Sequence, residues 1–171
     1  HFSAETKAYG GNIQTEFQYP LFSLLANGKL RSIDFPLESF PLAKGLGIAG
    51  KLSFNLETTF DKKNWDLLSL ENTKVNLQLA DTSYLGDNLY ISAFKVPKIT
   101  QLLLSTEALL SKQKLEIFSV NIDCNLGQAR AKGLFHLSKN FKVDYGNFNI
   151  DLKFSEEGKE KLAGYLALVT G

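Results

Sequence analysis

Residues 147–154, which read NFNIDLKF, alternate strictly between polar and apolar side chains. Side chains point alternately to the two faces of a β-strand, so this stretch would place four apolar groups on one face. The apolar set is Phe148, Ile150, Leu152 and Phe154. Such a strand must lay this face against other apolar groups. The stretch therefore predicts one strand of an antiparallel sheet whose second face is solvated.

The same alternation recurs upstream in residues 51–60, 73–80 and 115–126. Near Phe118 it shifts by one residue, as a β-bulge would produce. Residues 99–110 fit both helical and strand spacing, but their β-branched start and the polar turn after them favour a strand. We therefore expect a mainly β fold, built as a curved antiparallel sheet that forms an open barrel, a sandwich or a β-groove.

The length of 171 residues predicts a single domain, 1–171, which we divide into three parts. Residues 1–44 are expected to be an irregular N-terminal part, with short extended pieces around Ile13–Tyr19 and Lys29–Phe35 that Pro20 and an Asn27-Gly28 turn interrupt. Residues 45–154 are expected to hold the antiparallel strands. Residues 155–170 are expected to form a short C-terminal helix, with Ser155 as its N-cap and acidic residues in its first turn.

Three glycines, Gly45, Gly47 and Gly50, have the spacing of a dinucleotide-binding motif. That motif needs a helix directly after it. Here a strand is expected to follow, so we interpret the three residues as turn glycines.

Charge and composition argue against nucleic acid as a partner. The net charge is +1, and only Arg31 and Arg130 could contact phosphate or guanine in a bidentate way. No run approaches the about 18 uninterrupted apolar residues that indicate a membrane-spanning helix.

No residue pattern indicates a catalytic or metal site, and no cofactor is expected. Cys124 shares the alternation of its apolar neighbours and is interpreted as a small buried hydrophobe. His136 has no acid at a nearby spacing in its strand, so a structural role is expected. Glu156 and Glu157 suit the positive end of a helix dipole. Trp65 is interpreted as a core or rim anchor.

The candidate binding site is the apolar face of the sheet. If the sheet curls incompletely, this face would form a trough that accepts a lipid, a detergent or the edge strand of a partner. Its expected lining is Leu52, Phe54, Leu56, Val75, Leu77, Leu79, Val120, Ile122, Phe148, Ile150, Leu152 and Phe154.

The end of the chain, residues 132–171, resembles the C-terminus of the type II secretion system protein N (GspN) family. It has a glycine-led strand, a turn, an alternating strand of the DLKF kind, an acidic cap and a Leu-rich short segment. Upstream, residues 50–60 with 70–80 are similar to the paired strands of that family, and residues 115–137 to its penultimate hairpin. The resemblance covers roughly residues 45–171.

The resemblance implies a non-enzymatic accessory of a type II secretion system that acts through protein contacts in the periplasm. Its implied partners are the inner-membrane platform or the outer-membrane secretin. The membrane-spanning start of the family is not in this chain, so an inner-membrane tether is expected outside it. The family also resembles AsmA-type β-groove proteins, in which a curved sheet can hold acyl chains. A lipid-binding or lipid-transfer domain is therefore the alternative.

Overall fold

The computed structural model of the chain describes residues 1–8, 10–61, 70–87, 89–91, 94–111, 113–138 and 142–163. In this part, nine strands form one antiparallel sheet and two short strands form a separate hairpin. The sheet consists of β1 (Phe2–Ala8), β2 (Gly11–Gln18), β3 (Leu25–Pro36), β4 (Ile48–Asp61), β5 (Leu70–Tyr84), β8 (Ile99–Ser111), β9 (Lys114–Cys124), β10 (Gly127–Leu137) and β11 (Val143–Phe154). The hairpin consists of β6 (Tyr90–Ile91) and β7 (Phe94–Lys95).

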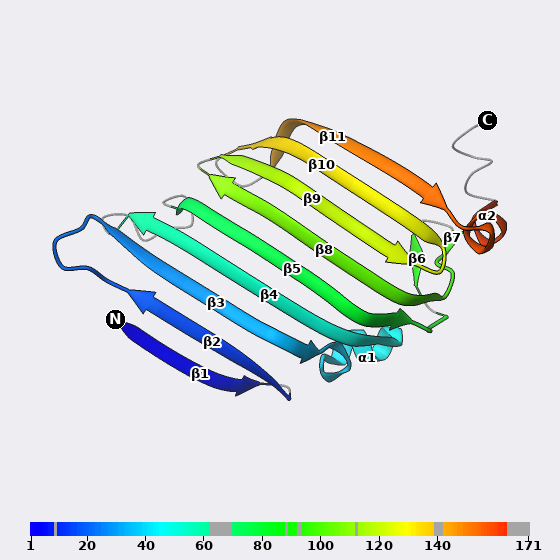
Figure 1. The fold of residues 1–171 in the computed structure, drawn as a ribbon, viewed down its shortest axis with the longest axis horizontal. Coiled ribbons are helices and arrows are strands. Elements are labelled where there is room, and N and C mark those ends of the chain that lie inside the picture. The colour runs from blue at the N-terminus through cyan, green and yellow to red at the C-terminus, as the bar shows by residue number, and fades with distance from the viewer. Residues whose placement is uncertain are drawn as a thin grey trace.

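The large sheet is open. Figure 1 shows it face on, with β1 at one edge and β11 at the other. The strands follow one another in chain order, and only the β6–β7 hairpin interrupts the series, between β5 and β8. The sheet is curved and does not close, and a short helix follows its last strand. The predicted mainly β fold with a curved antiparallel sheet and a short C-terminal helix is therefore confirmed.

The alternating stretches form strands because each can bury one set of side chains against the neighbouring strands. The ambiguous residues 99–110 lie in β8, so the strand interpretation is confirmed. The bulge is confirmed as well: Glu107 pairs with Ser119 and Ala108 with Ile117, so Phe118 has no residue opposite it in β8.

The structure differs from the prediction for residues 1–44. This part is not irregular, because it contains β1, β2 and β3, which continue the sheet. Asn27-Gly28 does not form a turn but lies inside β3, where Gly28 pairs with Phe17 on one side and Thr58 on the other. Pairing along two neighbouring strands outweighs the local turn preference of these two residues. The turn lies earlier, where the Ser23 N–H donates to the Pro20 carbonyl.

Short helices lie at the ends of strands. The connection between β3 and β4 contains the 3-10 turn η1 (Leu37–Ser39) and the helix α1 (Pro41–Leu46). Gly47 ends α1 with a left-handed φ of 70°, and β4 follows directly, so the turn interpretation is confirmed for Gly47. It is wrong for Gly45, which lies inside α1, and for Gly50, which lies inside β4.

The C-terminal helix, α2 (Glu156–Lys161), follows β11. Ser155 is its N-cap, as predicted: its Oγ accepts a hydrogen bond of 2.9 Å from the Gly158 N–H. The rest of the predicted helix, residues 164–170, lies outside the described residues.

Few large side chains of the described part are fully buried. Phe35, Tyr84 and Leu126 are buried near one end of the sheet, where η1, α1, α2 and the β6–β7 hairpin lie, whereas Ala26 and Leu137 are buried near the other end. Phe35 stacks on Phe40, with ring centroids 5.0 Å apart. The buried residues are therefore few and lie in separate places, and they form no core along a whole face of the described sheet.

Candidate binding surfaces

The register of the sheet brings all of the predicted lining residues to one face, which we call the apolar face. Residues directly opposite each other in neighbouring antiparallel strands share a face. Leu79, for example, pairs with Leu52 in β4 and with Leu104 in β8. A first row across the sheet contains Phe35, Leu52, Leu79, Leu104, Ile122, Ala129 and Leu152. A second contains Ile13, Ser32, Phe54, Leu77, Thr106, Val120, Ala131 and Ile150. A third contains Thr15, Leu30, Leu56, Val75, Ala108, Ile117, Gly133 and Phe148.

No second sheet or helical layer covers the middle of this face within the described ranges. The central side chains, such as Phe54 and Leu77, are only half-buried, although they lie in the middle of the sheet. On the edge strand β11, Phe148, Ile150 and Leu152 are exposed. The face that the sequence predicted to need a cover is thus bare in the part of the chain that can be described.

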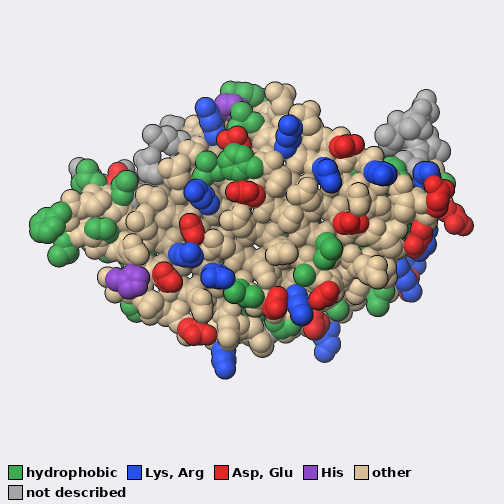
Figure 2. Space-filling view, in the orientation of Figure 1, with side chains coloured by type: hydrophobic (Ala, Val, Ile, Leu, Met, Phe, Trp, Pro, Cys, Tyr) green, Lys and Arg blue, Asp and Glu red, His purple; other side chains and the backbone are tan. Residues whose placement is uncertain are grey.

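The opposite face, which we call the polar face, carries most of the charged and amide groups. Figure 2 looks onto this face and shows Lys, Arg, Asp and Glu side chains across its middle. A hollow of about 410 Å³ opens on it, lined by Glu16, Gln18, Asn27, Gly28, Lys29, Glu57, Thr58, Thr59, Asn72 and Lys74. A second, of about 500 Å³, lies nearer the centre, between Arg31 and Glu107. The first hollow contains none of the predicted lining residues, whereas the second is lined mostly by residues of the polar face but also by Phe54 and Leu77.

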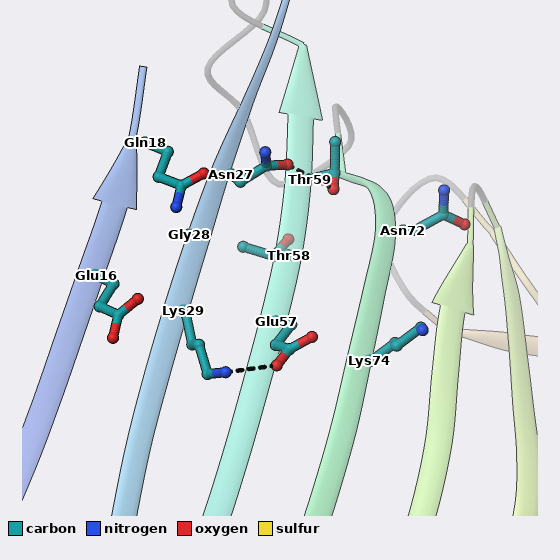
Figure 3. Close-up of a pocket in the computed structure, with 10 residues that line it drawn as sticks. All are labelled: Glu16, Gln18, Asn27, Gly28, Lys29, Glu57, Thr58, Thr59, Asn72 and Lys74. Atoms are coloured by element: carbon teal, nitrogen blue, oxygen red, sulfur yellow. Dashed lines mark hydrogen bonds and ion pairs between the residues drawn. The ribbon is translucent and has the colours of Figure 1, made fainter. Parts of the chain in front are cut away.

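One ion pair dominates the first hollow (Figure 3). Lys29 Nζ lies 2.8 Å from Glu57 Oε1, and the Thr59 hydroxyl donates to Asn27 Oδ1 at 3.0 Å. The hydrogen bond from Lys29 lowers the pKa of Glu57, with a smaller contribution from Asn55. A carboxylate held ionised in this way is a weak base and a poor proton donor at neutral pH, so the hollow suits polar contacts better than acid–base chemistry.

The other residues discussed from the sequence fall on both faces. Cys124 is half-buried and pairs with Gly127, which puts it on the apolar face with Ile122. His136 lies on the polar face, where its ring stacks on that of Tyr145 with centroids 4.3 Å apart. No three His, Cys, Asp or Glu side chains come together as metal ligands in the described part of the chain. Trp65 lies outside the described residues.

Glu156 and Glu157 lie in the first turn of α2, where each makes an ion pair with a lysine of the same helix. Glu157 Oε1 also accepts a hydrogen bond of 2.8 Å from the Asn125 side chain, which connects α2 to the turn between β9 and β10. These contacts fit the structural interpretation of the two acids.

Sequence reasoning missed a third surface, the loop between β2 and β3, which we call the apolar loop (residues 19–25). Tyr19, Leu21, Phe22, Leu24 and Leu25 are all exposed. The signal that could have found it is the absence of any charged residue between Glu16 and Lys29.

Comparison with protein families, with curated proteins and with solved structures finds no match to this chain. The resemblance to the type II secretion system protein N family therefore stays a prediction. Among the residues that the structure describes, none of the helices has the length and apolar character needed to cross a bilayer.

Proposed function

We propose that this chain is a non-enzymatic binding domain that holds the acyl chains of a lipid on its apolar face. The observation that carries the proposal is the largely apolar surface that extends from β2 to β11, without a second layer among the described residues. Apolar patches larger than a few hundred Å² are rare on soluble monomers and mark interaction sites. A bare surface of this kind is stabilised when something apolar covers it.

The size of the face suits acyl chains. The longest rows cover eight strands, β2 to β11, and seven strand-to-strand steps of about 4.8 Å give a length of roughly 34 Å across the sheet. One leaflet of a bilayer is about 15 Å thick in its hydrocarbon part, so a row is long enough for two acyl chains end to end.

The chemistry of the face supports an acyl ligand over a protein partner. The three central rows contain aliphatic residues, Ala, Gly, Ser, Thr and a few Phe, and no ionisable side chain. Protein interfaces take most of their affinity from Trp, Tyr and Arg in specific pockets. A surface of Leu, Val and Ile makes non-directional contacts, which is what a flexible hydrocarbon chain needs.

Two neighbouring substitutions in the central strand β5 test the proposal. Leu77 is on the apolar face, and Gln78, next to it, is on the polar face. Native mass spectrometry of the gently purified chain should show mass shifts that match phospholipid or fatty acid. Leu77→Lys should abolish these shifts, and Gln78→Lys should keep them. Circular dichroism checks that both variants are folded. A clean apo mass for the native chain, also after incubation with palmitate, would refute acyl binding.

A second candidate function is the one that the resemblance implies, an accessory of a type II secretion system that acts through protein contacts in the periplasm. The observation that favours it is the outer edge of β11, which has no strand partner within the described ranges. β11 is 12 residues long, contains no proline and is exposed along nearly its whole length. Such an edge is a template for pairing with a strand of another protein.

A lysine on an edge strand opposes the pairing of that edge with a strand of another protein, so substitutions to lysine in β11 test this second candidate. Asn149→Lys with Asp151→Lys changes the polar side of β11, and Asn76→Lys with Gln78→Lys is the matched control in the central strand β5. Titration against purified periplasmic domains of the platform and the secretin should give binding that only the β11 variant weakens. Absence of binding to both domains, or equal loss in both variants, would rule out this contact.

A further inference from the structure

The apolar loop between β2 and β3 has a layered arrangement of side chains. Its base is polar, with Gln18 at the end of β2 and the Thr59 hydroxyl bonded to Asn27 in β3. Tyr19, an aromatic residue with a polar tip, follows the base. The outermost part contains Leu21, Phe22 and Leu24.

These outer side chains extend into solvent. Phe22 is 104% exposed and Leu21 is 84% exposed, so they pack against almost nothing in the described part of the chain. Figure 2 shows hydrophobic side chains gathered at the left end of the molecule, where Figure 1 places the β2–β3 loop. No charged residue occurs anywhere between Glu16 and Lys29.

The backbone of the loop satisfies part of its own hydrogen bonding. The Ser23 N–H donates to the Pro20 carbonyl at 3.3 Å, and the Leu25 N–H donates to Ser23 Oγ at 3.0 Å. Pro20 has no N–H to satisfy. These features lower the cost of moving the loop into surroundings that offer few hydrogen-bond partners.

We propose that the apolar loop inserts into the interface of a lipid bilayer. The order of polar base, tyrosine and aliphatic tip matches the change from headgroups to hydrocarbon, since tyrosine prefers the interfacial region. A protein partner would be expected to meet charged or hydrogen-bonding side chains as well, but residues 21–24 contain no charge, and their one polar side chain, Ser23, accepts a hydrogen bond from the Leu25 N–H of the loop itself. The insertion is independent of acyl binding on the apolar face, because the loop extends beyond the sheet.

Vesicle flotation with phosphatidylcholine, with and without phosphatidylglycerol, tests the insertion. Leu21→Ser with Phe22→Ser should weaken binding by roughly 100- to 10,000-fold, because each of the two large apolar side chains contributes a free energy worth about one to two powers of ten. Because the loop is uncharged, binding should change little with salt or with phosphatidylglycerol. The matched control is Leu42→Ser with Leu85→Ser, two exposed leucines near the other end of the strands.

A fluorescent probe provides a second readout that does not depend on the folding of the serine variants. In a Cys124→Ser background, an environment-sensitive fluorophore on Leu21→Cys should shift to the blue with vesicles and be quenched by acyl-chain quenchers. The same label on Leu42→Cys should not respond. Flotation that is equal for the loop variant and the native chain would overturn the proposal, as would absence of binding. So would a loop-dependent dimer that ignores vesicles.

The two lipid contacts can fail separately. Leu77→Lys should remove acyl ligands and keep vesicle flotation, whereas the loop variant should keep the acyl ligands and lose flotation. Loss of flotation in Leu77→Lys together with unchanged flotation in the loop variant would assign vesicle binding to the apolar face and exclude the loop.

Discussion

Phe35 is the largest side chain that the described residues bury almost completely. Its ring stacks on Phe40 and lies against Gly11, where an added Cβ would come within 2.3 Å of the ring. Gly11 therefore leaves the space that the ring fills. Through these contacts Phe35 joins β2, β3 and the connection that follows β3 into a small core at one end of the sheet.

Replacement of Phe35 by alanine should cost about 3–5 kcal/mol of unfolding free energy, the usual range for a buried phenylalanine. Phe22→Ala, which removes the same group from an exposed position, should change the stability by no more than about 0.5 kcal/mol. Urea unfolding followed by circular dichroism measures both values. Equal stability of the two variants would contradict the burial of Phe35.

The faces of individual residues could be predicted from the sequence, because alternation in a strand is a local property. All of the predicted lining residues share a face for this reason. The place of Asn27-Gly28 inside a strand could not be predicted, because the turn preference of these two residues competes with their pairing to β2 and β4. The exposure of Leu21 and Phe22 could not be predicted from these residues alone, because an apolar residue in a loop and one in a core look alike in sequence.

The helix α2 is held to the sheet by a few short-range contacts. Ser155 Oγ accepts from the Gly158 N–H and donates to the Asn125 carbonyl at 2.7 Å. Gly158 is buried against Leu126, and a Cβ there would come within 1.9 Å of the Leu126 carbonyl oxygen. A helix of six residues does not form alone in water, so it depends on these contacts.

Removal of the N-cap should release this helix. Ser155→Ala should destabilise α2 by about 1 kcal/mol, the typical cost of losing a serine cap. Hydrogen exchange of the α2 amides should accelerate about fivefold, which corresponds to that energy. The exposed Ser3 in β1 offers the control, since Ser3→Ala should leave α2 exchange unchanged. Unchanged α2 exchange in Ser155→Ala would show that the cap does not hold the helix.

Acid should weaken the hydrogen bonds that the Glu157 carboxylate of α2 accepts. The hydrogen bonds from Lys161 and, to a lesser extent, Asn125 lower the pKa of Glu157 below its ordinary value of 4.5. A lowered pKa in the folded state means that the stabilisation is present above the ordinary pKa and is lost as pH falls through the folded value. The effect is small because Glu157 is exposed and water screens its charge.

The Glu157→Gln variant isolates this contribution. Near neutral pH the native chain should unfold at a slightly higher temperature than the variant, and the difference should shrink as the pH falls below 4.5 and through the lowered pKa of Glu157. Thermal unfolding at a series of pH values provides the measurement. A difference that is constant with pH would mean that the Glu157 charge has no part in stability.

Individual elements could mostly be predicted as well. Strands within residues 45–154, the bulge at Phe118 and the Ser155 cap each follow from a local signal of alternation or capping. In residues 1–44 only the short extended pieces around Ile13–Tyr19 and Lys29–Phe35 could be predicted, and they lie largely in β2 and β3. β1 and the full length of these strands could not be predicted, because β1 and β2 alternate weakly and contain many polar residues on both faces. They form because β3 offers a paired edge, which is a property of the whole sheet.

At the scale of the whole molecule, the described residues form a sheet with an apolar face that none of them covers in its middle, a hollowed polar face and two edges without a strand partner among them. The sequence predicted one-sided strands, but it could not distinguish between a barrel, a sandwich and an open sheet. Closure depends on how twist adds up over nine strands and on what covers the apolar face, and neither is a local property.

The most direct measurement of this architecture compares two neighbouring positions of β8 in a Cys124→Ser background. Thr106 lies on the apolar face, opposite Leu77 and Val120, and Ser105 lies on the polar face, opposite Gln78 and Asn121. Maleimide should label Thr106→Cys and Ser105→Cys in the delipidated protein. Addition of palmitate should slow the labelling at position 106 strongly and leave the labelling at position 105 unchanged. Equal labelling rates with and without palmitate at both positions, or protection of position 105 alone, would contradict acyl binding on the apolar face.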